Sequence, residues 1–317
     1  MDAEADAPAV EVHGLTRRFG AVTALDAVSF AVRAGELFGV IGPDGAGKTT
    51  LLRTLVSLLL PDAGRVRVLG LDPVADVWRL RARVGYMPGR FALYPDLSAE
   101  ENLRFFAAVF GTDLHDGLAS VEPIWRQLAP FAARRAGALS GGMKQKLALC
   151  CALVHAPAIL CLDEPTTGVD AVSRREFWDL LDRLRGGGLT IVVSTPYMDE
   201  AARCDRVALV QQGRVLQVDA PGAISAAYPR PLVAVRAADR LGMLAVLRRF
   251  PHAAAAWPFG ACAHYTDARA GHPVEAVAAE LRAFLSREGI TDASVSPQPA
   301  GIEDSFMWHL VAAGAHG

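Results

Sequence analysis

One stretch of the chain has the residue types and spacing that bind phosphate. It fits the pattern G-x-x-x-x-G-K-[ST] and comprises Gly42, Pro43, Asp44, Gly45, Ala46, Gly47, Lys48, Thr49 and Thr50, here called the phosphate loop. Its glycines would let backbone N–H groups converge on phosphate oxygens. Lys48 would reach the β- and γ-phosphates, and the Thr49 hydroxyl would bind Mg²⁺. The alternative, a glycine-rich turn with an incidental lysine, is disfavoured by the strand and helix expected on either side.

A second candidate site is a pair of acids at the end of an apolar run. Residues 159–162 are apolar, and Asp163 and Glu164 follow them. Asp163 would hold Mg²⁺ through water, and Glu164 would polarise the attacking water as a general base. The competing interpretation, a solvated strand end, is disfavoured by the phosphate loop upstream. Together the two motifs fit kinases, GTPases and helicases equally well.

The elements that position these residues alternate between strand and helix. Residues 28–32 alternate in polarity, as a half-buried strand does, while the continuous apolar runs at 37–41, 158–162 and 189–193 predict buried strands. Residues 48–60 predict a helix closed by Pro61. This alternation indicates an α/β fold with a mostly parallel sheet that is covered on both faces. Residues 91–131 read as mostly helical, with Ser98 and Glu101 as a capping box.

Turn-forming residues divide the chain into two expected domains. Pro221, Gly222, Pro229 and Pro231 mark the boundary. We therefore expect a nucleotide-binding domain over 8–222, with a helical subdomain at about 91–157, and a small α/β accessory domain over 230–317. The second domain has a predicted strand at 232–235, predicted helices at 241–250 and 274–288, and an amphipathic segment at 302–311.

Composition narrows the possible partners and compartment. With 52% hydrophobic residues the 317-residue chain has ample material for a core, and its net charge of -2 gives no support for a nucleic-acid partner. The most apolar stretch, 147–162, is too short to span a membrane, and the acidic N-terminus lacks the pattern of a signal peptide. We expect a cytoplasmic protein without direct membrane insertion, so a membrane role would need a membrane-spanning partner.

A third motif connects the chain to a family. Residues 139–145, Leu-Ser-Gly-Gly-Met-Lys-Gln, resemble the LSGGxxQ signature of ABC ATPases and lie shortly before the acidic strand, as in that family. The resemblance covers 10–218 and implies a P-loop NTPase core with an antiparallel N-terminal β part. It also implies ATP and Mg²⁺ as ligands and a head-to-tail dimer with a second ATPase. The signature residues that would then contact the nucleotide of the opposite subunit are Ser140, Gly141, Gly142 and Gln145.

Other residues match the family's pattern one by one. Phe19 matches the aromatic residue that stacks on adenine, with a core phenylalanine as the competing interpretation. Asp170, within 168–170, matches the D-loop at the dimer interface. Segments 197–201 and 204–206 match ATPases of the ABC-2 export class, and the chain resembles the first half of paired or fused drug-export ATPases. This implies polytopic permease subunits, a place on the cytoplasmic face of the membrane, and a substrate chosen by those permeases.

The chain departs from the family at two positions. Gly89 stands where the family has a glutamine that touches Mg²⁺ and the attacking water, and Pro196 stands where it has a histidine that bonds the γ-phosphate. Loss of such a donor typically costs on the order of a hundredfold or more in rate. We therefore expect an impaired own site and an intact signature that serves a partner ATPase. The alternatives are a non-hydrolysing regulatory module and a soluble ABC ATPase of DNA repair or translation, which usually carries coiled-coil insertions or two cassettes.

Overall fold

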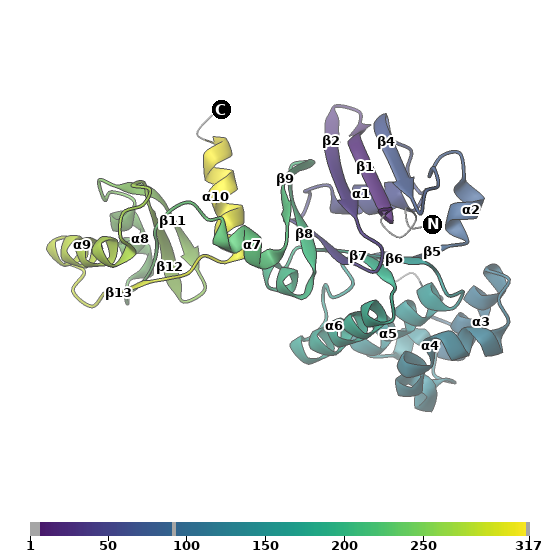
Figure 1. The fold of residues 1–317 in the computed structure, drawn as a ribbon. Coiled ribbons are helices and arrows are strands. Elements are labelled where there is room, and N and C mark those ends of the chain that lie inside the picture. The colour runs from purple at the N-terminus through teal and green to yellow at the C-terminus, as the bar shows by residue number, and fades with distance from the viewer. Residues whose placement is uncertain (1–6, 91–92, 315–317) are drawn as a thin grey trace. The chain divides into compact units, whose positions relative to one another are not determined.

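The computed structural model describes residues 7–90 and 93–314, which fold as two compact units divided between Ala220 and Pro221 (Figure 1). The first unit thus ends two residues before the predicted limit at 222, because helix α7 (Pro221–Ala226) belongs to the second unit. The predicted start of the helical subdomain, at about 91, lies outside the described residues. Each unit is considered by itself below.

A six-stranded sheet forms the centre of the first unit, with strand order β5-β6-β7-β3-β8-β9. Five strands run parallel, and β9 pairs antiparallel with β8. Strands β3, β6 and β7 are buried along their whole length, as predicted from their apolar runs. The strand bounds are β3 Leu37–Ile41, β5 Val84–Met87, β6 Ile159–Asp163, β7 Thr190–Thr195, β8 Arg206–Gln211 and β9 Arg214–Asp219.

The first unit also has a smaller antiparallel sheet with the strand order β2-β1-β4. Its strands are β1 (Val10–Phe19), β2 (Val22–Val32) and β4 (Ala63–Val68). Its apolar face, helix α1 (Lys48–Leu55) and one face of the central sheet share a single core. The predicted helix end at residue 60 is wrong. The helix stops at Leu55 because Ser57 takes a left-handed conformation, with φ of 62°.

The remaining helices of the first unit include α5, which contacts β5, and α6, which contacts β7. Helix α3 starts in the predicted capping box: the Ser98 side chain accepts from the Glu101 backbone N–H, and the Glu101 carboxylate accepts from the Ser98 N–H. The helices are α2 Val77–Arg81, α3 Ala99–Val109, α4 Leu114–Leu128, α5 Gly141–Leu153 and α6 Ala171–Gly186, with 3-10 turns η1 Ala129–Phe131, η2 Ala136–Ala138 and η3 Met198–Arg203.

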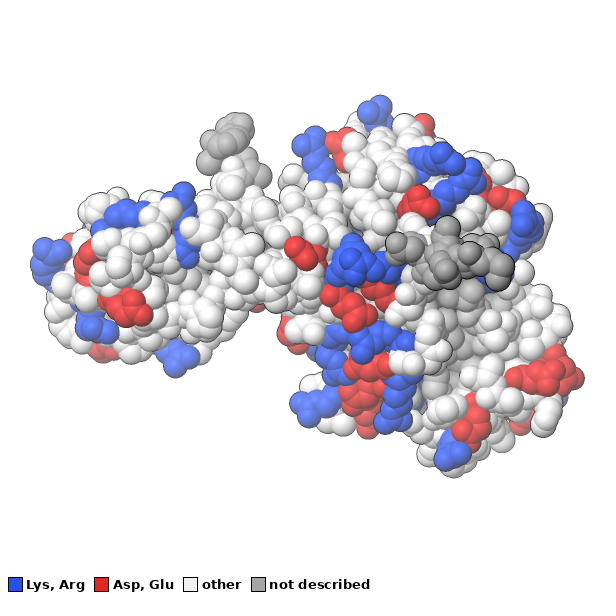
Figure 2. All heavy atoms as spheres, viewed as in Figure 1, with Lys and Arg blue, Asp and Glu red and all other residues white. Residues whose placement is uncertain are grey.

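Figure 2 shows cationic and anionic side chains intermixed over much of the drawn face.

The second unit is a split βαβ sandwich followed by a terminal helix. Its antiparallel sheet has the order β11-β12-β10-β13, and helices α8 and α9 supply one side of its core. The His264 ring on β12 bonds the Asp304 carboxylate of α10 at 2.6 Å, which fixes α10 to the sheet. The elements are β10 Leu232–Arg236, α8 Arg240–Leu247, β11 Ala253–Phe259, β12 Cys262–Asp267, α9 Val274–Arg287, β13 Ser294–Pro297 and α10 Ile302–Gly314. In neither unit does a described helix have the length and apolar character needed to cross a bilayer.

Candidate functional site

The phosphate loop joins the end of β3 to the start of α1. Gly47 has a φ of 102°, and a Cβ there would lie 2.4 Å from the Ala24 carbonyl oxygen. A Cβ on Gly42 would lie 2.1 Å from the Val210 carbonyl oxygen. Only glycine can bring the backbone this close to its neighbours, so these two positions set the shape of the loop. The helix that follows directs its N-terminus at the loop, which favours an anion.

Lys48 is the first residue of α1, and its side chain is only 3% exposed. Its ammonium donates to the carbonyl oxygens of Gly42, at 2.8 Å, and Pro43, at 2.9 Å. The same nitrogen lies 3.1 Å from Oε1 of Glu164. The structure thus brings together the predicted phosphate-binding lysine and the predicted general base.

Asp163, at the end of β6, is the centre of a second group of oxygens. Its Oδ1 accepts from the Thr49 hydroxyl at 3.0 Å and from the Ser194 hydroxyl at 2.8 Å. Hydroxyl and carboxylate oxygens are the hard ligands that Mg²⁺ prefers. The donor set therefore fits the ion predicted for Thr49 and Asp163, whereas Ser194, which supports Asp163 from β7, was not predicted. A polar residue inside a buried apolar strand was the signal that could have identified it.

Glu164 has an unusual backbone conformation that aims its side chain at the loop. Its φ is 49°, a left-handed value that is rare for residues other than glycine. The conformation is held by two bonds from its N–H, to the carbonyl and hydroxyl oxygens of Ser194, both at 3.1 Å. Strain of this kind often marks functional positions.

A cavity of about 410 Å³, the phosphate-loop cavity, adjoins these groups. Glu164 and six residues of the loop line it, namely Asp44, Gly45, Gly47, Lys48, Thr49 and Thr50. Gly42, Pro43 and Ala46 do not line it and shape the loop from behind. Sequence reasoning missed four lining residues, Val22, Thr23, Ala24 and Gln212. These residues belong to the β1–β2 and β8–β9 hairpins. The β8–β9 hairpin is held against the phosphate loop by a hydrogen bond of 3.0 Å from the Gly213 N–H to the Ala46 carbonyl.

Phe19 stands at the last position of β1, outside the lining of this cavity. It is 46% exposed, so the competing interpretation as a core residue is wrong. It pairs with Val22 across the β1–β2 turn, and Val22 lines the cavity. Phe19 is therefore the register neighbour of a residue that lines the cavity.

The signature residues and Asp170 do not line the phosphate-loop cavity of their own chain. Ser140 caps α5, and its hydroxyl accepts from the Met143 N–H at 3.3 Å. Gly141 and Gly142 form the first turn of that helix, and Gln145 lines a different groove. Asp170 caps α6 through the N–H groups of Ser173 and Val172, and bonding to the Ser173 N–H lowers the pKa of its carboxyl.

The two departures from the family pattern lie close to the acidic strand end. A Cβ on Gly89 would be 2.9 Å from the Asp163 carbonyl oxygen, so the backbone after β5 approaches more closely than a side chain permits. Pro196 follows Thr195, whose hydroxyl bonds the buried carboxylate of Glu200. Glu200 also accepts from the Thr166 hydroxyl at 2.7 Å, which ties the loop after Glu164 to the turn at residue 196.

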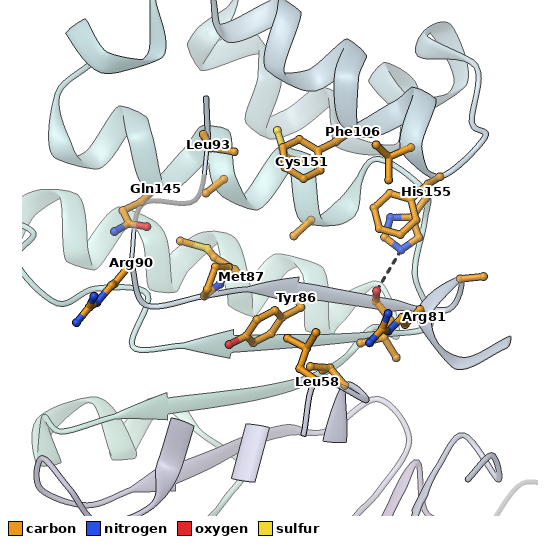
Figure 3. Close-up of a pocket in the computed structure, with 18 of the residues that line it drawn as sticks. Leu58, Arg81, Tyr86, Met87, Arg90, Leu93, Phe106, Gln145, Cys151 and His155 are labelled. Atoms are coloured by element: carbon orange, nitrogen blue, oxygen red, sulfur yellow. Dashed lines mark hydrogen bonds between the residues drawn. The ribbon is translucent and has the colours of Figure 1, made fainter. Parts of the chain in front are cut away.

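A second cavity, of about 520 Å³, lies between β5 and helices α3 and α5 and is here called the β5 groove (Figure 3). Its lining is largely apolar and includes Met87, Leu93, Phe106 and Cys151. Trp78, at its margin, is 80% exposed.

One titratable ring lies in the β5 groove. The Nε2 of His155 contacts the Val84 carbonyl oxygen at 3.3 Å, and the ring stacks on Phe110 with centroids 3.7 Å apart. Burial lowers the pKa of His155.

Known proteins resemble the first unit in both sequence and structure. The ABC transporter family profile matches residues 25–167. The probable multidrug ABC transporter ATP-binding protein YbhF of Escherichia coli (strain K12) is 43% identical over 222 residues, covering 68% of this chain and 38% of that protein. The chain therefore spans well under half of that relative. The Nod factor export ATP-binding protein I of Paraburkholderia xenovorans (strain LB400) is 41% identical over 222 residues, covering 69% of this chain and 73% of that protein.

Solved structures give the same result for the fold. An ATP-binding subunit of an ABC transporter superposes with a TM-score of 0.62 at 27% identity, covering 68% of this chain and 92% of that one. The dimeric ATP-binding cassette MJ0796, bound to ADP and Pi, superposes with a TM-score of 0.61 at 25% identity, covering 67% and 98%. The first unit thus has the P-loop fold of ABC ATPase cassettes. The chain belongs to the family of ABC transporter ATP-binding proteins.

Proposed function

We propose that this chain is the ATP-binding subunit of an ABC exporter that works with separate membrane subunits on the cytoplasmic face of the membrane. The observation that carries the proposal is that Lys48, Thr49 and Glu164 line one cavity, while Asp163 accepts a hydrogen bond from Thr49. Lys48 would bind the β- and γ-phosphates, Thr49 and Asp163 would hold Mg²⁺, and Glu164 would orient the attacking water. Phe19 would stack on the adenine. Relatives named for multidrug and Nod factor export support transport out of the cell.

The chain's own ATP site would hydrolyse slowly. Pro196 has neither a side-chain donor nor an N–H, and Gly89 has no side chain to reach Mg²⁺ or water. Ser140, Gly141, Gly142 and Gln145, by contrast, retain the full signature. The chain would therefore complete the catalytic site of a second ATPase in a head-to-tail heterodimer, with Asp170 at the interface, while its own site mainly holds ATP.

The β5 groove would receive the membrane partner. It is open and largely apolar, and the exposed side chains around it include Trp78, Val109 and Leu58. Large exposed apolar patches commonly mark interaction sites. A permease segment that lies along the membrane surface and inserts apolar side chains would fit this chemistry. On this scheme the first unit is the nucleotide-binding domain and the second unit, which begins at Pro221, is an accessory domain.

The test is to purify the chain, measure binding of ATP and Mg²⁺ by calorimetry, and follow phosphate release alone and with co-purified partners. We expect Mg²⁺-dependent ATP binding, slow turnover alone, and faster turnover in a complex that contains a second ATPase and a permease. Absence of ATP binding would overturn the proposal. Brisk turnover by the isolated chain that Glu164→Gln abolishes would overturn the impaired site.

A second candidate function is favoured by the same two positions. Gly89 and Pro196 also suit a regulatory subunit that binds ATP as a clamp and never hydrolyses it. The two functions differ in one measurement. In the assembled complex with the partner's phosphate-loop lysine replaced, residual hydrolysis that Glu164→Gln removes indicates a slow ATPase, and none indicates a clamp.

A further inference from the structure

One face of the Phe19 ring is covered by the side chain of Arg17. The guanidinium carbon of Arg17 lies 4.8 Å from the ring centroid, which is the geometry of a cation–π pair. The β1–β2 register shifts between Arg17 and Arg18, so the contact itself, and not regular strand alternation, shows that the two side chains lie on the same side. Both residues belong to β1, so the backbone that carries them is held in the antiparallel sheet.

Arg17 is in turn anchored by Asp62, the residue before β4. Its Nη1 donates to Oδ1 of Asp62 at 2.9 Å, while Oδ2 accepts from the Arg18 backbone N–H at 2.6 Å. The Asp62 N–H donates to the Thr16 carbonyl at 2.9 Å. The carboxylate therefore joins the guanidinium to the backbone of β1. The Arg17 side chain is 22% exposed, whereas the ring that it covers is far more open.

The open part of Phe19 is at the rim of the phosphate-loop cavity. Phe19 and Val22 are register partners, and directly opposed residues of an antiparallel pair share one face of the sheet. Val22 lines the cavity together with Thr23 and Ala24. Because the guanidinium occupies one ring face, a flat ligand that enters from the cavity can stack only on the other.

We infer that Arg17 and Asp62 are positioning residues for the nucleobase, which hold Phe19 so that its free face stacks on the purine of ATP. The inference rests on the proposed function, because it concerns the base of the same nucleotide. A ring fixed before the ligand arrives loses less side-chain freedom on binding. The contribution of Arg17 and Asp62 to ligand affinity should therefore require the base of the nucleotide and should not involve its phosphates.

The experiment compares two ligands on the full chain in the presence of Mg²⁺: ATP, and inorganic tripolyphosphate, which lacks a base. Arg17→Ala should lower the affinity for ATP by about two- to fivefold, a range taken from the strength of exposed cation–π pairs. The affinity for tripolyphosphate should not change. Asp62→Asn should act in the same direction. Phe19→Ala should weaken ATP more than either. The matched control is Arg18→Ala, which removes the same charge from the next residue. It should not lower the affinity for ATP relative to the affinity for tripolyphosphate.

Three results would overturn the inference. Arg17→Ala could leave the affinity for ATP unchanged, or lower the affinities for ATP and tripolyphosphate equally. Arg18→Ala could lower the affinity for ATP alone, as Arg17→Ala is expected to do. A thermal melt of each variant checks folding, and Arg17→Gln replaces Arg17→Ala if the latter does not fold. Failure of the unaltered chain to bind ATP would overturn the proposed function itself, which is a different outcome from ATP binding that Arg17 does not influence.

Discussion

The ammonium of Lys48 and the carboxylate of Glu164 form an ion pair of 3.1 Å inside the phosphate-loop cavity. A lysine ammonium has three donors, and the carbonyl oxygens of Gly42 and Pro43 take the other two. A γ-phosphate would have to take the place of Glu164 on this lysine. The carboxylate would then be released to act on water only when a phosphate is present.

The first prediction concerns this competition. Glu164→Gln removes the charge that competes with phosphate for Lys48, so the affinity for ATP should rise by about fivefold, the equivalent of roughly 1 kcal/mol. Calorimetric titration with MgATP measures it. Glu176→Gln is the control, because Glu176 also pairs with a lysine, Lys146, at 2.7 Å on the surface. Weaker ATP binding in Glu164→Gln would contradict the competition.

The second prediction separates the two departures from the family pattern. Pro196→His restores a donor at the place of the γ-phosphate and should raise hydrolysis at this site about tenfold or more. The measurement is phosphate release by the complex in which the partner's phosphate-loop lysine is replaced. Pro196→Ala is the control, since it removes the proline ring without adding a donor. Equal rates of phosphate release in Pro196→His and Pro196→Ala would show that the added donor does not contribute to hydrolysis.

The third prediction is that Gly89→Gln fails to restore activity. Its Cβ would lie 2.9 Å from the Asp163 carbonyl oxygen, so the backbone must move before the side chain can enter. Strain of this kind typically costs about 1–3 kcal/mol, and the melting temperature should fall. Gly186→Gln is the matched control, because Gly186, also in the first unit, has no left-handed φ and no atom within 4 Å of its Cβ position. A rate gain in Gly89→Gln without loss of stability would show that the backbone adapts at no cost.

The parts of the site that sequence reasoning found are those written in contiguous residues. Gly42 to Thr50 form one loop between a strand and a helix, and Asp163 and Glu164 follow a buried strand directly. Gln212 could not be found in this way. It reaches the phosphate-loop cavity only because the β8–β9 hairpin is bonded to the loop, a contact between segments far apart in sequence.

The fold shows the same division between local and long-range information. Buried runs predicted β3, β6 and β7, and the capping box predicted the start of α3. The end of α1 was missed because the leucines at 58–60 favour a helix, while the Leu58 and Leu59 N–H groups instead bond the Arg53 carbonyl past the left-handed Ser57. Nothing in the local composition distinguishes that turn from another helical turn.

The fourth prediction uses the buried ring of His155. Burial lowers its pKa below the ordinary value of 6.5, so the unfolded chain binds this proton first as the pH falls. This group's stabilising contribution is therefore present above pH 6.5 and decreases below it, until the pH passes the folded pKa. His155→Gln should flatten the fall in unfolding free energy between pH 7 and 5, measured by urea titration and limited to about 1.4 kcal/mol per pH unit. His13→Gln, at an exposed site, is the control. An unchanged slope in His155→Gln would contradict the assignment.

The fifth prediction tests the β5 groove as the place of the membrane partner. Trp78 is 80% exposed at its margin, where an indole gains most by being covered. Trp78→Ala should leave ATP affinity and the melting temperature unchanged and reduce co-purification of the permease by about tenfold or more, as hot-spot tryptophans do. The matched control is Leu241→Ala, since Leu241 is 82% exposed on α8 of the second unit and does not line the groove. Retention of the permease by Trp78→Ala, or its equal loss in both variants, would place the docking surface elsewhere.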